Sequence, residues 1–164
     1  MSELSYNYKM TLNYSFEEIW EVIKNPNNYV KFIKSCESLE LLEEKNKNDN
    51  FYYKAKLKIS TPIKYIYFDS ILEKKSKNEI ILYNLKNDYI DNLYFSWKLK
   101  RKKNKTEITL NFKLLFYSYT IQYISIYNRE NIINDLIKSF INIIYKECGK
   151  RKKSLYITFK EIIY

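Results

Sequence analysis

Few side chains in this sequence could serve as bases, nucleophiles or metal ligands. The chain has no His, which excludes a His general base, a Ser-His-Asp or Cys-His nucleophile pair and a His-ligated metal. Cys36 and Cys148 are far apart in the sequence, so they form neither a Cys-x-x-Cys redox pair nor a four-thiolate zinc site. The single Gly, Gly149, excludes a glycine-rich loop that binds phosphate or a dinucleotide. These absences favour a protein that binds a molecule over one that transforms it.

Carboxylates are the remaining candidates for acid–base chemistry. One carboxylate with a raised pKa could assist a cyclisation or a dehydration. The acids expected nearest to a ligand cavity are Asp69, Glu73, Asp88, Asp91 and Glu130. No pair of them has a spacing that demands such a role, and solvated surface acids are the simpler interpretation. A reactive thiol at Cys36 would need a nearby cation, for which Lys34 is the candidate.

Positive charge is concentrated in two segments. The chain has 29 Lys and Arg against 19 Asp and Glu, a formal net charge of +10. The segments account for all of this excess and consist of Lys98, Lys100, Arg101, Lys102, Lys103, Lys105, Lys150, Arg151, Lys152 and Lys153. We interpret them as a basic docking surface for an anionic membrane or for rRNA phosphates. The alternative is that they are solvated turns whose charges keep strand edges apart.

The 164 residues allow one domain with one hydrophobic core. Apolar residues alternate with polar ones over residues 4–10, which predicts a strand with one buried face. Ser15 and Glu18 have the spacing of a capping box, and the helix that they begin must end before Pro26. Residues 27–34 are expected to form a second short helix.

A run of strands follows, separated by short turns rich in Lys and Asn. The expected strands cover residues 37–44, 50–59, 63–73, 79–86, 92–101 and 106–117. Short connections require antiparallel neighbours, and Asn tolerates the left-handed turn geometry that Gly would otherwise supply. Residues 120–147 predict a long amphipathic helix that ends near Gly149. Residues 154–164 could be a strand or a short helix.

This topology brings the two basic segments together. Alternate turns of an antiparallel meander lie at one end of the sheet, and the long helix should finish at that same end. The sequence has no apolar run near the ~20 residues of a membrane span. Its N-terminal residues favour neither a secretory signal nor a typical mitochondrial presequence, with a processed mature form as the alternative. Two lone Cys suit a reducing compartment. We therefore expect an intracellular protein.

The order of elements resembles the helix-grip arrangement of START-like proteins, the polyketide cyclase/dehydrase or SRPBCC superfamily. The resemblance implies an α+β fold in which a curved antiparallel sheet of about seven strands wraps around a long C-terminal helix. Two short helices follow the first strand. Residues 1–149 would form this domain, and residues 150–164 a basic C-terminal extension.

A motif within residues 25–36 is more specific. It is similar to the D-P-x-x-Y-P-x-F-L-P-x-C signature of the Coq10/RatA group, from which it departs at the Asp and at the two later prolines. The positions that keep residue type and spacing are Pro26, Tyr29, Phe32 and Cys36.

The resemblance implies a hydrophobic cavity between the sheet and the C-terminal helix. Candidate wall residues are Phe32, Tyr67, Tyr89, Phe95, Trp97, Leu136 and Phe140, with ordinary core packing as the alternative. Coq10-type members bind ubiquinone or a related isoprenoid lipid and support respiration without catalysis. The resemblance thus implies a quinone or lipid ligand, no required cofactor, and a place on the matrix side of the mitochondrial inner membrane or in a bacterial cytoplasm. RatA-type binding to the large ribosomal subunit and a cyclase-like activity remain alternatives.

Overall fold

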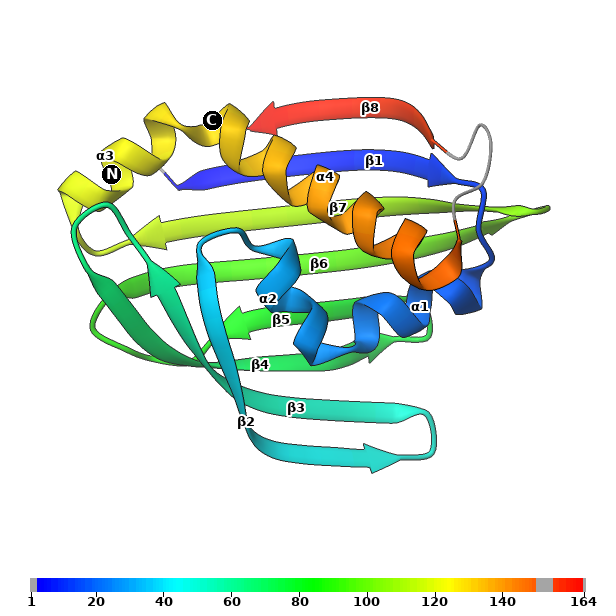
Figure 1. Cartoon of the computed structure of the whole chain (residues 1–164), viewed down its shortest axis with the longest axis horizontal. Coiled ribbons are helices and arrows are strands. Elements are labelled where there is room, and N and C mark those ends of the chain that lie inside the picture. The colour runs from blue at the N-terminus through cyan, green and yellow to red at the C-terminus, as the bar shows by residue number, and fades with distance from the viewer. Residues whose placement is uncertain (1–2, 150–154, 164) are drawn as a thin grey trace.

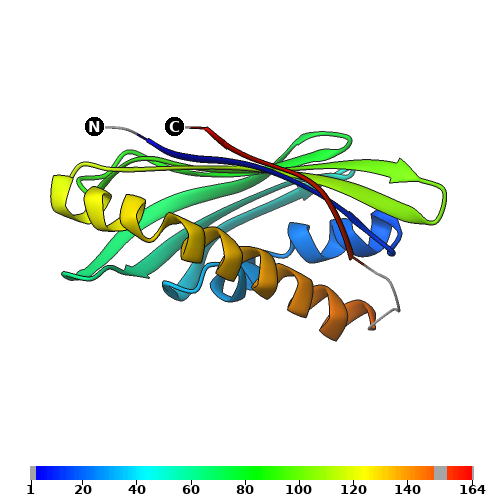
Figure 2. The same ribbon diagram turned by 90° about the horizontal axis from the view of Figure 1, so that it is seen from above.

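An eight-stranded antiparallel sheet forms one layer of the structure, and the helices cover one of its faces (Figure 1, Figure 2). The computed structural model describes residues 3–149, and the backbone of residues 155–163. The strands are β1 (Leu4–Leu12), β2 (Cys36–Lys47), β3 (Asn50–Ser60), β4 (Tyr65–Ser76), β5 (Glu79–Asn84), β6 (Ile90–Lys102), β7 (Lys105–Phe116) and β8 (Leu155–Ile163). Their order in the sheet is β2-β3-β4-β5-β6-β7-β1-β8. The helices are α1 (Phe16–Lys24), the 3-10 helix η1 (Pro26–Asn28), α2 (Tyr29–Phe32), α3 (Tyr119–Tyr127) and α4 (Arg129–Cys148).

The predicted helix-grip fold is confirmed, with one strand more than expected. The additional strand is β8, which pairs antiparallel with β1 and lies at the edge of the sheet. Residues 154–164, for which the sequence allowed either a strand or a short helix, therefore contain a strand. Residues 150–154 lie outside the described residues, and the division of the chain at residue 149 stays a prediction.

Local sequence signals explain the start of the fold. In β1, every second side chain from Leu4 to Leu12 is buried, as the alternation predicts. At α1, the Ser15 hydroxyl accepts from the backbone N–H of Glu18, and the Glu18 carboxylate accepts from the backbone N–H of Ser15. Both arms of the capping box are present and satisfy N–H groups that the first turn leaves unpaired.

The turn between β2 and β3 uses Asn and Asp in place of glycine. Asn48 has φ 48° and Asp49 has φ 64°, both in the left-handed region. A two-residue hairpin with both central φ angles positive matches the twist of its strands. This is the substitution of Asn for Gly that the Lys/Asn-rich turns predicted, and Asp shares it.

The predicted long helix is divided into α3 and α4. Asn128 separates them, and its side-chain amide donates to the carbonyl of Ile124 at 3.1 Å. Asn competes in this way for backbone groups that a continuous helix would use, so it favours a helix boundary. α4 alone is the long C-terminal helix; it ends at Cys148, and the C-cap residue Gly149 follows with a φ of 81°.

The centre of the core is an aromatic cluster between the sheet and α4. The ring centroids of Trp97 and Phe140 are 4.6 Å apart, and Phe32 lies 5.8 Å from the first and 5.6 Å from the second. All three side chains are fully buried. The cluster joins β6, α2 and α4 and forms the wall behind the cavity described next.

Candidate functional site

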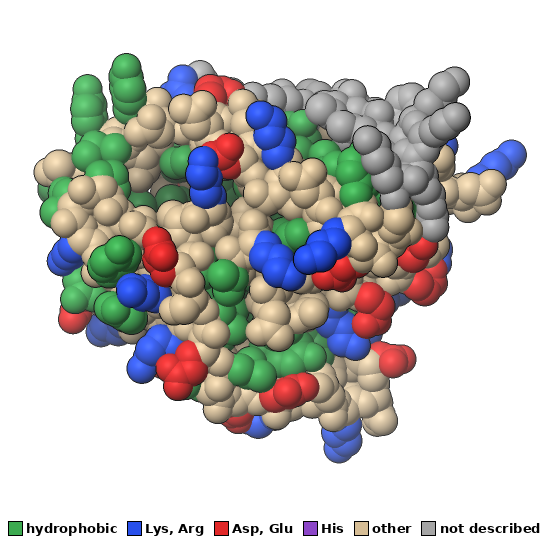
Figure 3. Space-filling model, in the orientation of Figure 1, with side chains coloured by type: hydrophobic (Ala, Val, Ile, Leu, Met, Phe, Trp, Pro, Cys, Tyr) green, Lys and Arg blue, Asp and Glu red, His purple; other side chains and the backbone are tan. Residues whose placement is uncertain are grey.

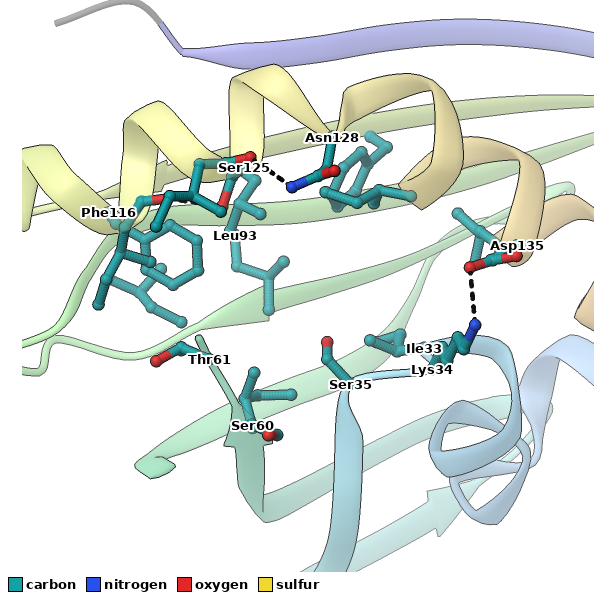
Figure 4. Close-up of a pocket in the computed structure, with 18 of the residues that line it drawn as sticks. Ile33, Lys34, Ser35, Ser60, Thr61, Leu93, Phe116, Ser125, Asn128 and Asp135 are labelled. Carbon is teal, nitrogen blue, oxygen red and sulfur yellow. Dashed lines mark hydrogen bonds and ion pairs between the residues drawn. The ribbon is translucent and has the colours of Figure 1, made fainter. Parts of the chain in front are cut away.

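A cavity of about 400 Å³ lies between the concave face of the sheet and the helices α2, α3 and α4 (Figure 4). The β3–β4 loop, residues 61–64, and the loop between α2 and β2 both contribute lining residues, and we call this side of the cavity its mouth (Figure 4). Its inner wall is Phe32, Phe68, Ile90, Leu93, Phe95, Phe112, Leu114, Phe116, Ile121, Ile124, Ile132 and Leu136. The size lies within the range of small-molecule sites, about 300–1,000 Å³.

Charged side chains line the cavity only at its mouth. They are Lys34, Glu37 and Asp135. The Lys34 ammonium and the Asp135 carboxylate are 3.3 Å apart and join the α2–β2 loop to α4 (Figure 4). No ionisable side chain of residues 3–149 therefore lines the inner wall, where a bound molecule would meet hydrocarbon.

The uncharged polar groups of the wall are largely directed to the protein's own backbone. The Ser125 hydroxyl donates to the carbonyl of Ile121 at 2.8 Å, and the Thr61 hydroxyl donates to the carbonyl of Lys64 at 2.6 Å. The amide of Asn128 is engaged with Ile124, as described above. These bonds satisfy the donors locally, so the wall selects for an apolar ligand more than for a particular polar group.

Three of the seven predicted wall residues line the cavity, namely Phe32, Phe95 and Leu136. Trp97 and Phe140 lie behind them in the aromatic cluster, so the structure places these two in the core. Tyr67 and Tyr89 lie outside the lining. Tyr67 is 53% exposed because it alternates with buried neighbours that face the helices. Tyr89 lies in the β5–β6 loop with the Lys64 ammonium 4.5 Å from its ring centroid.

The comparisons with known proteins fit this architecture. The sequence profile of the family described as "Polyketide cyclase / dehydrase and lipid transport" matches residues 12–121, more than half of the chain. The chain belongs to this family. No curated protein sequence matches it. Several solved structures share the fold of this chain at low sequence identity.

Three of these structures illustrate the range. The Zhui aromatase/cyclase from Streptomyces sp. R1128 has a TM-score of 0.68 at 12% identity, covering 90% of this chain and 96% of its own. The 18 kDa protein CC1736 from Caulobacter crescentus has a TM-score of 0.68 at 14% identity, covering 92% and 100%. A START superfamily protein from Mycobacterium smegmatis has a TM-score of 0.67 at 10% identity, covering 87% and 98%.

The four motif positions singled out within residues 25–36 are buried, namely Pro26, Tyr29, Phe32 and Cys36. The Tyr29 hydroxyl donates to the carbonyl of Ile23 at 3.0 Å. Burial raises the pKa of this hydroxyl far above its ordinary value, and the Trp97 indole partly offsets the effect. The motif thus anchors α2 beneath the sheet, and only Phe32 of the four reaches the cavity.

The candidate acids lie away from the cavity lining. Asp69 is 3.6 Å from the Lys54 ammonium, and Glu73 accepts from the Tyr83 hydroxyl at 3.1 Å. Desolvation raises the pKa of the Tyr117 hydroxyl, and the nearby carboxylates of Asp91 and Asp88 raise it further. The last candidate, Glu130, is in the first turn of α4.

Cys36 is a buried thiol. Burial raises its pKa to about 11, and its Sγ donates to the carbonyl of Ser38 at 3.5 Å. A raised pKa keeps the sulfur protonated at neutral pH, and only the thiolate is a good nucleophile. The Lys34 ammonium, the candidate partner of a reactive thiol, is bonded to Asp135 instead.

Only part of the predicted basic docking surface lies within the residues that the structure describes. The β6–β7 hairpin carries Lys98, Lys100, Arg101, Lys102, Lys103 and Lys105, whereas Lys150, Arg151, Lys152 and Lys153 lie outside the described residues. Arg101 pairs with Glu17 at 2.5 Å and Lys102 with Glu107 at 3.7 Å, which reduces the local excess of charge. The Tyr14 hydroxyl donates to the carbonyl of Gly149, and Thr106 donates to the carbonyl of Tyr14. The end of α4 therefore lies beside the base of this hairpin, as the topology predicted.

The sequence reasoning missed most of the cavity wall. Leu93, Phe112 and Phe116 line it from β6 and β7, and Ile121 and Ile124 line it from α3. The available signal was the alternation along each strand, because Phe95 and Leu93 share one face of β6. Applying that period from Phe95 and Phe112 would have found the strand residues.

Proposed function

We propose that this protein binds an apolar small molecule in the cavity and catalyses no reaction on it. The observation that carries the proposal is the separation of the lining into a hydrocarbon interior and a charged mouth. Burial of apolar ligand surface against this wall supplies affinity without any polar group placed for chemistry. A general acid or base would have to lie within hydrogen-bond reach of the reacting atom.

We propose ubiquinone or a related isoprenoid lipid as the ligand, in support of respiratory electron transport. The family's description includes lipid transport. The motif at residues 25–36 resembles that of Coq10-type proteins, which bind such lipids. An isoprenoid chain with a weakly polar ring has the chemistry that this wall favours.

Two measurements test the proposal. Organic extraction of the purified protein followed by mass spectrometry should recover a quinone or isoprenoid lipid, and calorimetric titration with a short-chain ubiquinone should show saturable binding. Ser125→Phe, which fills the cavity from α3, should abolish binding. Tyr123→Phe on the outer face of the same helix is the matched control and should bind normally. An empty protein that also fails to bind the quinone would refute the proposed ligand.

The second candidate is a cyclase-like enzyme, which the family's description favours. The acid or base would then be Lys34, Glu37 or Asp135, the charged groups of the lining. Incubation of the protein with a linear poly-β-ketone distinguishes the two functions. An aromatic or cyclised product that is lost in Asp135→Asn would establish the enzyme and overturn the binding proposal.

A further inference from the structure

The outer face of α3 carries a stripe of exposed tyrosines. Tyr119, Tyr123 and Tyr127 are spaced four residues apart, which places them on one side of a helix. They are 76%, 73% and 82% exposed, the largest values among the large hydrophobic side chains of residues 3–149. Hydrophobic side chains project from the surface over α3, at the upper left of Figure 3.

This stripe belongs to a segment without charge. Residues 114–128 contain no Lys, Arg, Asp or Glu, although charged residues make up 29% of the chain. The opposite face of α3 is part of the ligand site, since Ile121, Ile124 and Ser125 line the cavity. One short helix therefore separates the cavity from the tyrosine stripe.

The loops around the cavity mouth extend the exposed apolar surface. Ile63 of the β3–β4 loop and Tyr117 at the end of β7 are 58% and 51% exposed. Tyr89 links these two segments: its ring lies under the Lys64 ammonium, and its carbonyl accepts from the backbone N–H of Tyr117 at 3.0 Å. We call this set the aromatic rim, and it consists of Ile63, Tyr89, Tyr117, Tyr119, Tyr123 and Tyr127.

We propose that the aromatic rim docks the cavity mouth on a lipid bilayer, with α3 lying along the membrane surface. Tyr is enriched at membrane interfaces because its ring is apolar and its hydroxyl stays hydrated. A charge-free helix face needs no anionic lipid for this contact, so a zwitterionic phosphatidylcholine surface is sufficient. A ligand that leaves the mouth would then enter the bilayer without crossing water.

The rim and the basic hairpin lie at opposite ends of the sheet. The β3–β4 and β5–β6 loops are at the end with α3, whereas the β6–β7 hairpin is at the other end (Figure 1). Docking through the hairpin would hold the mouth away from the membrane. The two modes therefore make different predictions about lipid charge and about which substitutions weaken binding.

Vesicle flotation with the purified full-length chain tests the docking surface. The protein should bind vesicles of phosphatidylcholine alone, with little change when phosphatidylglycerol is added or salt is raised. The triple variant Tyr119→Ser, Tyr123→Ser, Tyr127→Ser should lose binding by about tenfold or more, since interfacial affinity scales with the apolar area inserted. Lys100→Glu with Lys103→Glu in the hairpin should bind like the unchanged protein, and so should Leu41→Ser with Leu42→Ser, which removes exposed apolar groups from β2.

Each other outcome overturns the proposal. Binding that requires anionic lipid and is lost in the hairpin variant would assign docking to the basic end. Absence of vesicle binding together with a dimer that the tyrosine variant dissociates, measured by analytical ultracentrifugation, would assign the rim to a second copy of this chain. Circular dichroism shows whether each variant is folded.

The docking proposal depends on the proposed function only for the identity of the ligand that would be delivered to the membrane. The flotation experiment contains no quinone, so its failure leaves ligand binding by the cavity unaffected. Conversely, Ser125→Phe should still bind vesicles even if no ligand is ever found in the cavity.

Discussion

The Lys34 ammonium and the Asp135 carboxylate lie 3.3 Å apart across the mouth of the cavity. Lys34 precedes β2 and Asp135 lies on α4, so the pair ties together two walls that no strand pairing connects. The Lys34 side chain is 79% exposed. An ion pair so exposed contributes only about 0–1 kcal/mol to the free energy of unfolding. Its effect should be on the opening of the mouth.

Lys34→Ala is expected to speed the dissociation of a bound ligand several-fold while changing the free energy of unfolding by less than ~1 kcal/mol. Stopped-flow dissociation and urea denaturation measure the two quantities. Lys45→Ala removes another exposed ion pair, with Glu43 on β2, and should change neither. Equal dissociation rates for all three proteins would show that the Lys34–Asp135 pair does not restrain the mouth.

Phe140→Ala should lower the free energy of unfolding by about 3–5 kcal/mol, the usual cost of deleting a buried aromatic ring. The ring packs on Trp97 and Phe32, and its loss leaves a void between β6 and α4. Chemical denaturation measures the change. Tyr119→Ala, at an exposed aromatic position, should stay within about 0.5 kcal/mol of the unchanged protein. A small effect at Phe140 would contradict its assignment to the core.

The free energy of unfolding should decrease as the pH rises, because of the Cys36 thiol. Burial raises the pKa of this thiol from 9.0 to about 11. The folded state therefore holds a proton that the unfolded state releases between these values. The stabilisation is complete below pH 9, decreases as the pH rises, and is lost above pH 11; its size is about 2–3 kcal/mol.

Cys36→Ala provides the comparison, because other groups, including Tyr83 with its pKa raised to about 12, also titrate at high pH. The difference in urea stability between the two proteins should narrow between pH 9 and pH 11. A constant difference across this range would show that the thiol is not buried as described.

Charge reversal in the hairpin tests the basic docking surface. If it contacts rRNA, Lys100→Glu with Lys103→Glu should reduce co-sedimentation with large ribosomal subunits, and the loss should grow as salt is lowered. The surface substitutions should leave the free energy of unfolding within ~0.5 kcal/mol. If this variant binds large ribosomal subunits as well as the unchanged protein does, and also binds anionic vesicles as well, the basic residues are interpreted as parts of solvated turns.

The fold was predictable because its signals are local. Alternation in β1, the capping box at Ser15 and the Asn-rich turns each specify a short element. Short connections then leave an antiparallel meander as the arrangement. The break at Asn128 was less accessible, since the apolar stripe continues through it and only the side-chain bond to Ile124 reveals the boundary.

The cavity was harder to predict because it depends on how curved surfaces face one another. Residue type did not distinguish Phe95, which lines the cavity, from Trp97, which lies in the core behind it. The prediction for Tyr67 failed for a different reason. The family resemblance predicted that Tyr67 lines the cavity wall, whereas the two-residue period of the strand places it on the outer face of the sheet. The exposed tyrosines of α3 could not be distinguished by residue type, because the chain has 18 Tyr.

The position of β1 has a consequence for how the protein folds. β1 lies between β7 and β8, with Leu4 opposite Leu114 and Ser5 opposite Ile163. β1 is synthesised before its pairing partners β7 and β8. Long loops must therefore close before the pairing of β1 contributes stability. Hairpins such as β2–β3 can form first, but completion of the sheet should be the slow kinetic step. Until then the apolar face of β1 is available to chaperones or to aggregation.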